Sequence, residues 1–237
     1  MLRVVVLYPD LLGTYGDGGN AMVLAARARA RGVDVEVHDV TIGEVIPRAA
    51  LYLLGGGEDG PQRLACDLLV DGGFVDRVEE GGHVFAVCAG LQILGTTFSI
   101  EGDASYRGVG LVDAWTTRGP TRSVGNFATL VRGRMMVGFE NHGGVTELGD
   151  NVEPFGDVVV GRGNDGIVDG FRTPRVTATY AHGPVLAQNP WLADELLSAV
   201  TGQALAPWPS VADRLYVERC DAVSTRRSDV DRTGGRR

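Results

Sequence analysis

The sequence predicts an α/β fold in which an open, mostly parallel β-sheet is flanked by helices and carries an antiparallel extension. Between Val4 and Val87, short apolar runs typical of buried strands alternate with segments of helical pattern. Many of these runs end at glycines, of which the chain has 35, roughly twice the ordinary usage. After Thr97 the chain changes to short runs broken by glycine, which is typical of antiparallel strands joined by loops.

The first half of the chain follows a βαβ order. An apolar run at Val4–Leu7 predicts a buried first strand, and a glycine-rich loop follows it. A helix is expected from about Asn20, because Met22–Arg31 suits a helix and Gly32 then ends it. The later elements are a strand at 33–40, a strand at Leu51–Leu54, a helix from Pro61 to about Val70 and a strand at Val84–Val87. This order implies parallel strands covered by helices on both faces.

The second half predicts the antiparallel part and one more helix. The expected strands are Tyr106–Leu111, Ala114–Thr117, Val124–Val131, Met135–Glu140, Val158–Val160, Gly166–Phe171 and Val176–Tyr180. A helix is expected from about Pro190 to Thr201. We therefore expect one domain over residues 1–220. Residues 221–237 are mostly Arg, Ser, Asp and Gly, and we expect a disordered tail there.

Composition limits the possible functions. The formal net charge of −8 and the pI near 5.0 argue against binding to nucleic acid. No run approaches the ~18 apolar residues of a membrane span, and a strand begins directly after Met1, so we expect neither membrane insertion nor a signal peptide. The 3 cysteines have no Cys-x-x-Cys spacing, which favours a reduced, cytoplasmic protein without a metal site.

Cys88 is the candidate nucleophile. It ends the apolar run Val84–Val87, and a helix-capable segment, Leu91–Leu94, begins almost at once. The small residues Ala89 and Gly90 allow a sharp reversal, so the stretch predicts a strand–nucleophile–helix elbow. A thiol at the first turn of a helix is expected to ionise more easily than usual. The alternative is a buried, inert cysteine, and the small residues around Cys88 argue against it.

A Cys nucleophile needs a base, and the candidates are His38, His83, His142 and His182. His182 follows the strand Val176–Tyr180, so it is expected at the same sheet edge as the elbow, where open α/β sheets bind ligands. His83 lies at the opposite end of its strand and is expected to be structural. His142 lies in a glycine-rich loop, where it could approach a ligand or simply form part of a turn, and its role remains open.

Glycine-rich turns offer two further candidate sites. Gly55-Gly56-Gly57 ends the third strand, and backbone N–H groups near Gly56 and of Ala89 could form an oxyanion hole. No Gly-Lys-Ser/Thr follows, which excludes a P-loop. The stretch 16–21 formally fits a dinucleotide-binding motif, with Glu36 as its acid, but Pro9 and a long loop separate it from the first strand.

Together these motifs resemble the class I (triad) glutamine amidotransferases, whose nucleophile motif is Cys-x-Gly-x-Gln, and their cobyric-acid-synthase-like branch. Within that branch the chain is similar to the glutaminase subunits of lipid II isoglutaminyl synthases. The resemblance covers most of the chain before residue 221. The stretches that carry it are 8–10, 13–20, 55–59, 85–92, 125–126, 138–142 and 180–184.

The resemblance implies a function and assigns roles. Residues 1–220 would be a glutamine amidotransferase domain that hydrolyses L-glutamine through Cys88 and His182. Arg122 would bind the substrate's carboxylate, with Arg118 as the alternative, and the motif residues Gln92 and Asn126 would line the site. No cofactor is implied in this chain. ATP and Mg²⁺ are expected on a Mur-ligase-like (MurT-like) synthetase subunit, which would form a heterodimer with this chain and amidate the D-glutamate of the peptidoglycan stem peptide.

One motif departs from the class I pattern. Many members have His-x-Glu, with the acid orienting the imidazole, whereas Pro184 stands two residues after His182. The missing acid could be Asp17 or Glu140 of this chain, or an acid of the partner, which we favour because it would prevent wasteful hydrolysis. The alternative functions are a stand-alone Cys–His amidohydrolase or peptidase, a glutaminase subunit for cobyrinate-type amidation, and a non-catalytic binding module.

Overall fold

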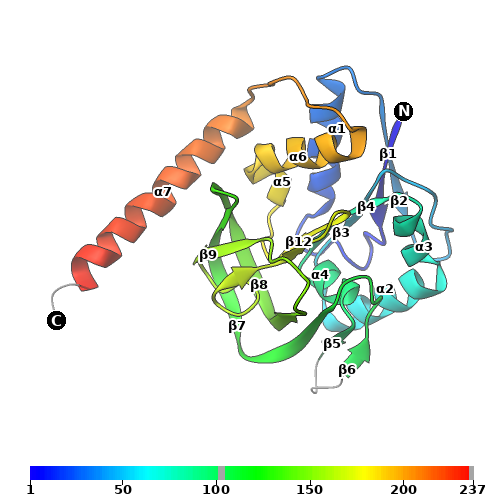
Figure 1. The fold of residues 1–237 in the computed structure, drawn as a ribbon, viewed down its shortest axis with the longest axis horizontal. Coiled ribbons are helices and arrows are strands. Elements are labelled where there is room, and N and C mark those ends of the chain that lie inside the picture. The colour runs from blue at the N-terminus through cyan, green and yellow to red at the C-terminus, as the bar shows by residue number, and fades with distance from the viewer. Residues whose placement is uncertain (101–104, 235–237) are drawn as a thin grey trace.

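The structure is a computed structural model that describes residues 1–100 and 105–234, with the backbone alone beyond Val223. Its first sheet has six strands in the order β11-β12-β4-β3-β1-β2 (Figure 1). The bounds are β1 Leu2–Leu7, β2 Val35–Val40, β3 Leu51–Leu54, β4 His83–Val87, β11 Phe171–Arg172 and β12 Val176–Thr179. All neighbours from β12 to β2 are parallel, and β11 is antiparallel to β12. The predicted parallel sheet is confirmed.

Helices cover both faces of this sheet. On one face α1 packs with α5 and α6, and on the other α2 packs with α3 and α4 (Figure 1). The bounds are α1 Gly18–Arg29, α2 Asp59–Asp71, α3 Phe74–Glu79, α4 Ala89–Leu94, α5 Val185–Gln188 and α6 Pro190–Thr201. The strand order explains why the two groups lie on opposite faces. The connection from β1 to β2 runs towards one edge of the sheet, and the connection from β3 to β4 runs towards the other edge. Because such crossovers are right-handed, reversing the direction places the connecting helix on the opposite face.

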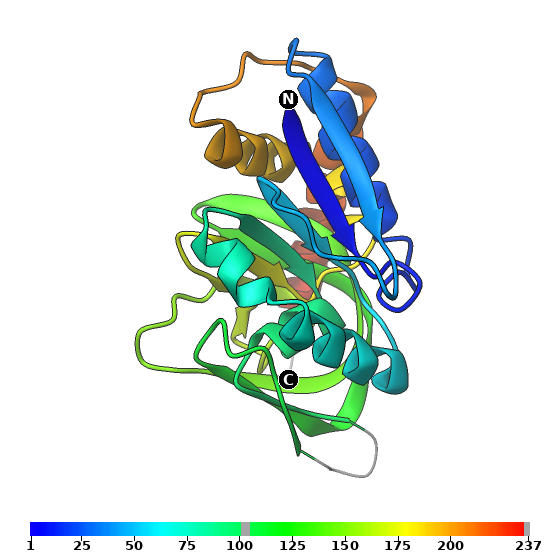
Figure 2. The same ribbon diagram turned by 90° about the vertical axis from the view of Figure 1, so that its right-hand side faces the viewer.

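The middle of the chain forms a second sheet, whereas the sequence predicts an extension of the first. Its strands are β5 Thr97–Ser99, β6 Ser105–Arg107, β7 Ala114–Val131, β8 Arg134–Leu148, β9 Gly156–Val160 and β10 Val168–Asp169. β7 and β8 form a long antiparallel hairpin, drawn in green in Figure 2. These strands pair mainly with each other. Among the described residues, isolated bridges link this region to the first sheet at Phe139–His182, beside the site, and at Glu153–Arg172.

The chain ends in α7, Val211–Gly234, which projects from the body (Figure 1). Its first half is anchored, because the Tyr216 hydroxyl donates to the Met135 carbonyl at 2.7 Å. The helix continues through residues 221–234, where the composition predicts disorder. No Gly or Pro interrupts 211–233, so no residue in this stretch breaks the helix. Residues 235–237 lie outside the described part of the chain.

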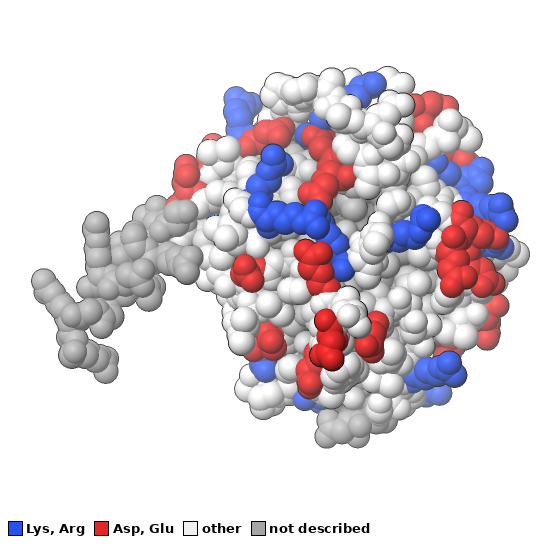
Figure 3. All heavy atoms as spheres, viewed as in Figure 1, with Lys and Arg blue, Asp and Glu red and all other residues white. Residues whose placement is uncertain are grey.

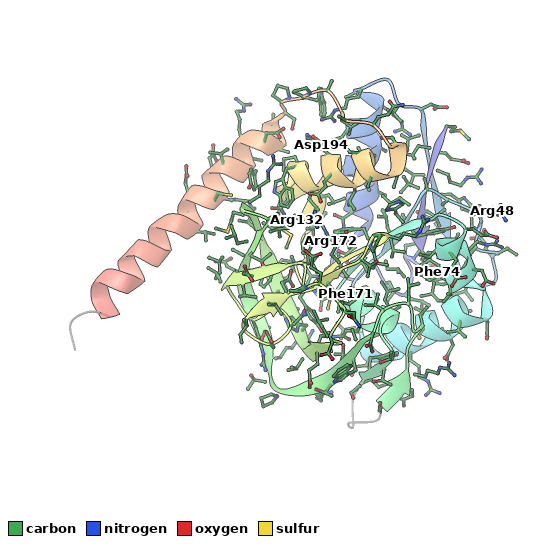
Figure 4. The ribbon with its side chains drawn as sticks, in the orientation of Figure 1. Arg48, Phe74, Arg132, Phe171, Arg172 and Asp194 are labelled. Atoms are coloured by element: carbon green, nitrogen blue, oxygen red, sulfur yellow. The ribbon has the colours of Figure 1, made fainter. Side chains whose placement is uncertain are left out.

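Charged side chains join α6 to both sheets. Arg172 of β11 donates to Glu195 of α6 at 2.7 Å, and Arg132, in the turn between β7 and β8, lies 4.0 Å from the same carboxylate (Figure 4). On the face seen in Figure 3, basic and acidic side chains lie interspersed. No helix in the described part of the chain is both long and apolar enough to span a membrane.

Candidate active site

The chain reverses sharply at Cys88, between β4 and α4. Cys88 has φ 49°, in the left-handed region that residues other than glycine rarely adopt. Gly90 allows the reversal, because a Cβ there would lie 2.7 Å from the Leu54 Cβ. The Gly90 N–H also donates to the Gly55 carbonyl at 3.1 Å. The predicted elbow geometry is therefore present, held against the end of the neighbouring strand β3.

The Cys88 thiol is buried. Burial, with a smaller contribution from the nearby Asp17 carboxylate, raises the pKa of Cys88 to about 12, and the Ala89 N–H offsets this only in part. The prediction of an easily ionised thiol is therefore wrong for the chain by itself. The helix that follows has only 6 residues, and its dipole does not outweigh the desolvation of a charge. To act as a nucleophile, the neutral Cys88 thiol would need a base.

His182 follows β12, the strand beside β4, as the sequence predicts. Its ring packs against Tyr15 and Phe139, with ring centroids 4.5 and 5.4 Å apart. Burial lowers the pKa of His182 to about 4, so the imidazole is neutral. Within the described residues, neither of its buried ring nitrogens has a hydrogen-bond partner. His182 therefore has the protonation state of a base, but it is hydrogen-bonded neither to Cys88 nor to an acid.

The two acids proposed within this chain are engaged elsewhere. Glu140 accepts from the Gly163 N–H at 3.1 Å and lies 3.3 Å from the His142 Nε2. His142 in turn stacks on Tyr180, with centroids 3.9 Å apart, so this pair belongs to the packing of the second sheet. Asp17 accepts from the Gly56 N–H at 2.7 Å. Neither acid orients His182.

A pocket opens beside Cys88. Its lining residues are Gly57, Glu58, Asp59, Gln62, Cys88, Ala89, Gln92, Ser99, Arg118, Arg122, Asn141, His142, Gly143 and Gly144. Four of the predicted site residues, Cys88, Ala89, Gln92 and Arg122, thus share one pocket. His182 is not among the lining residues.

Arg122 is held at the pocket rim. Its Nε donates to the Asn141 Oδ1 at 2.6 Å, and an Nη lies 3.3 Å from the Tyr15 hydroxyl. That hydroxyl donates to the Glu58 carboxylate at 3.2 Å. Arg118, the alternative, lies 3.8 Å from Asp59. The rim therefore presents two guanidinium groups and two carboxylates, which suits a ligand that carries both a negative and a positive charge.

Gln92 forms part of the pocket wall. Its Oε1 accepts from the Gln62 Nε2 at 2.8 Å, and its Nε2 donates to the Tyr180 hydroxyl at 3.1 Å. The Tyr180 hydroxyl also lies 2.7 Å from the Thr146 Oγ1. This chain of hydrogen bonds fixes the Gln92 amide next to Cys88.

Besides His182, two more predicted site residues, Gly56 and Asn126, lie outside the pocket. Asn126 is exposed on β7 and does not line the pocket. The N–H of Gly56 is engaged by Asp17, and it is the next residue, Gly57, that lines the pocket with Ala89. The sequence could not distinguish these glycines, because the choice depends on which N–H meets the Asp17 side chain.

The glycine-rich stretch 16–21 has a packing role. A Cβ on Gly19 would lie 2.4 Å from the Pro184 Cγ, and the Asn20 Oδ1 accepts from the Leu186 N–H at 2.9 Å. These contacts hold the segment after His182 against α1. These packing contacts explain the glycine and asparagine of the motif without dinucleotide binding.

Several residues at the site were not predicted from the sequence. They are Tyr15, which contacts His182, and the lining residues Gly57, Glu58, Gln62 and Asn141. Tyr15, Gly57, Glu58 and Asn141 lie in the stretches that carry the family resemblance, which was the available signal. Among the described residues, no cluster of His, Cys, Asp and Glu could hold a metal ion.

Comparison with solved structures identifies the fold. One neighbour is a glutamine amidotransferase with a TM-score of 0.55 and 20% identity, covering 84% of this chain and 98% of its own. Another, from the structure of PurLQS of Thermotoga maritima, has a TM-score of 0.56 and 16% identity, covering 85% of this chain and 96% of its own. The fold is that of the class I glutamine amidotransferases.

Sequence comparison gives the family. Residues 3–190 match the CobB/CobQ-like glutamine amidotransferase domain, and the chain belongs to that family. The GatD subunit of lipid II isoglutaminyl synthase from Streptococcus pneumoniae is 30% identical, over 97% of this chain and 93% of its own. The same subunit from Staphylococcus aureus is 31% identical over 83% of each chain. Cobyric acid synthase from Streptococcus sanguinis is 30% identical, over 63% of this chain but 32% of its own.

The resemblance inferred from the motifs is thereby confirmed, and this protein is a glutamine amidotransferase. Such an enzyme takes its nitrogen from the amide of glutamine.

Proposed function

We propose that this chain is the glutaminase subunit of an enzyme that amidates the D-glutamate of the lipid II stem peptide. It would hydrolyse L-glutamine and deliver the ammonia to a Mur-ligase-like partner. The observation that carries the proposal is the Cys88 elbow in the wall of a pocket with charges of both signs at its rim. Lipid II is proposed as the acceptor because the GatD relatives are named for it.

The pocket rim suits free glutamine as the substrate. A guanidinium binds a planar carboxylate through parallel hydrogen bonds, so Arg122 would bind the α-carboxylate. Glu58, joined to Arg122 through the Tyr15 hydroxyl, would accept from the α-ammonium. With both α-substituents held at the rim, the side-chain carboxamide would extend towards Cys88, past the fixed amide of Gln92.

The chemistry would follow a thioester route. His182 takes the proton of the Cys88 thiol, and the sulfur attacks the carboxamide carbon. The Ala89 N–H and an N–H of the glycine turn at 55–57 stabilise the oxyanion. His182 then protonates the departing ammonia, and water, deprotonated by the same imidazole, cleaves the thioester to glutamate.

The partner would supply the acid that orients the His182 imidazole. In the part of the chain that the structure describes, neither ring nitrogen of His182 has a hydrogen-bond partner, and both candidate acids are bound to other groups. An acid that orients the imidazole matters, because the wrong tautomer in a serine protease triad lowers kcat about 10⁴-fold. A carboxylate from the partner would therefore switch on hydrolysis only where the ammonia can be used. The partner would also supply the ATP and Mg²⁺ site.

The direct test is reconstitution. The chain is purified with the Mur-ligase-like partner, and glutamate release and amidation of lipid II are measured with glutamine, ATP and Mg²⁺. The Cys88→Ala complex is the control, and it should amidate from added ammonium salt but not from glutamine. A complex that consumes glutamine but leaves lipid II unchanged would contradict the proposed acceptor.

The same assay tests the other functions. A cobyrinic acid acceptor in place of lipid II tests the cobyrinate alternative, whose representatives this chain matches over only 32% of their length. A stand-alone hydrolase should be fully active without a partner. The neutral, buried Cys88 thiol and the unpaired His182 argue against such independence.

A further inference from the structure

The side chain of Asp17 is directed away from the helix that it precedes. Asp17 occupies the N-cap position of α1, where an Asp normally accepts a hydrogen bond from the first turn, yet it makes no such bond. Instead the carboxyl is turned into the protein, where the residue is only 6% exposed. A local preference broken in this way calls for another role.

Asp17 fixes one peptide of the glycine turn from one side. Its Oδ2 accepts from the Gly56 N–H at 2.7 Å. The carbonyl of the same peptide, that of Gly55, accepts from the Gly90 N–H at 3.1 Å. The peptide between Gly55 and Gly56 is thus held at both ends, by Asp17 and by the elbow that carries Cys88.

Glycine at position 55 makes this approach possible. A Cβ there would lie 1.9 Å from the Leu12 carbonyl oxygen and 2.8 Å from the Asp17 Cβ. The loop after β1 is therefore packed directly on the turn.

The fixed peptide determines where the next N–H lies. Gly57 lines the pocket together with Cys88 and Ala89, whereas Gly56 does not. In the described structure, no hydrogen bond to the Gly57 N–H is present. A donor without a partner beside the nucleophile is the group that an oxyanion hole requires.

We propose that Asp17 is a positioning residue, whose carboxyl locks the glycine turn so that the Gly57 N–H joins the Ala89 N–H in binding the oxyanion. This rests on the proposed glutaminase function. It replaces two earlier assignments. Gly57 takes the role predicted for Gly56, and Asp17 acts on the turn rather than on His182.

Charge and hydrogen bonding at Asp17 can be separated by experiment. Burial raises the pKa of Asp17 to about 6, and its charge in turn raises the pKa of Cys88. Asp17→Asn and Asp17→Leu both remove the charge and keep a side chain that branches at Cγ, although the leucine side chain is larger. Only Asn retains an acceptor for the Gly56 N–H, so a difference between these two variants reports the hydrogen bond.

The experiment compares both variants in the complex with the synthetase partner. If the turn is locked through this bond, kcat for glutamine hydrolysis should be about 10- to 100-fold lower in Asp17→Leu than in Asp17→Asn, somewhat less than the loss of a whole oxyanion donor. KM should differ less than about threefold, because Asp17 does not line the substrate pocket. Alkylation of Cys88 by iodoacetamide, which forms no oxyanion, should be equal in the two variants.

Equal kcat values in Asp17→Asn and Asp17→Leu would overturn the inference, and so would a difference confined to KM. Asp17→Ala replaces Asp17→Leu if the leucine variant gives no cooperative thermal transition. A wild-type complex that releases no glutamate would instead refute the proposed function, and this inference with it.

Discussion

The two strands that end at the site, β4 and β12, present their functional residues in different states. After β4, the backbone around Cys88 is held by the Gly90–Gly55 hydrogen bond, and the Asp17–Gly56 hydrogen bond fixes the adjacent turn. After β12, His182 is buried against Tyr15, its ring nitrogens have no hydrogen-bond partner among the described residues, and it does not line the pocket.

The difference between the Cys88 side and the His182 side shows which part of the site this chain builds by itself and which part is incomplete. The nucleophile side is held by contacts within this chain, the Gly90–Gly55 backbone hydrogen bond and the Asp17–Gly56 hydrogen bond. The base side needs an acceptor for His182, and the described residues provide none. A partner that contacts this side of the site could provide it. The predictions below test the two sides, beginning with the largest effect.

Replacing the nucleophile should remove activity entirely. Cys88→Ala should lower the rate of glutamine hydrolysis in the complex by more than about 10³-fold, because no other group forms the thioester. The melting temperature should change little, since only a sulfur atom is lost. The matched controls are Cys66→Ala and Cys220→Ala, which lie outside the pocket and should retain most of the rate. A Cys88→Ala complex that keeps a tenth of the rate would refute this role.

Replacing Arg122 should affect recognition of the substrate. Arg122→Ala should lower kcat/KM for glutamine about 10- to 100-fold, equivalent to about 1.4–2.8 kcal/mol for a lost charge-assisted contact. Arg118→Ala is the matched control, at the same rim but paired with Asp59, and should lower kcat/KM less than about fivefold. The reverse order of effects, read from steady-state kinetics, would transfer the carboxylate-binding role to Arg118.

Completing the base side should require the partner. Glutamine hydrolysis by the chain alone should rise at least about tenfold on adding the partner, because an acid would then orient His182. Changing that acid of the partner to Ala or Asn should return the rate to that of the isolated chain. Titration of the partner at fixed chain concentration gives this measurement. An isolated chain that already works at the full rate would show that the acid lies within it, and Asp17 and Glu140 would have to be re-examined.

The protonation state of Cys88 predicts a pH dependence. Its pKa is raised to about 12, so the thiolate is a small fraction at pH 7–9 and grows about tenfold per pH unit. The rate of Cys88 alkylation by iodoacetamide in the isolated chain should rise with this slope between pH 7 and 9. Mass spectrometry of the modified peptide separates Cys88 from Cys66 and Cys220. A plateau below pH 8 would mean that the thiol ionises easily, as the elbow alone suggested.

How much the sequence could predict differs between backbone and side chains. The apolar run at Leu51–Leu54 is β3, and the elbow at Cys88 has the expected conformation, because both follow from local patterns of small and apolar residues. The helix α3 was missed because it is short and follows two glycines that indicate a turn.

The site's hydrogen bonds could not be predicted in the same way. Whether Gly56 or Gly57 faces the pocket depends on Asp17, which is 39 residues away in the sequence. Asn126 belongs to a family motif, yet it is exposed on β7 and does not line the pocket. The state of Cys88 follows from burial by the whole domain, which the first turn of one helix cannot reveal.

The smallest effect is expected at the C-terminus. A chain ending at Cys220 keeps the hydrogen bond from Tyr216 to Met135 and the contact between Arg219 and Gln188. Glutamine hydrolysis in the complex should therefore stay within about twofold of wild type, and the melting temperature should fall by less than about 2 °C.

A chain ending at Ser210 is the informative control, because it loses both anchors. Gln188 donates to the His182 carbonyl at 3.5 Å, so the first half of α7 supports the segment that carries the base. This shorter chain should lose activity while Cys88 still reacts with iodoacetamide, since the elbow depends on contacts of β3 and β4. If the chain ending at Cys220 is inactive with the partner present, residues 221–237 take part in assembly or catalysis. If the chain ending at Ser210 is fully active, α7 does not support His182, and the base side depends on the partner alone.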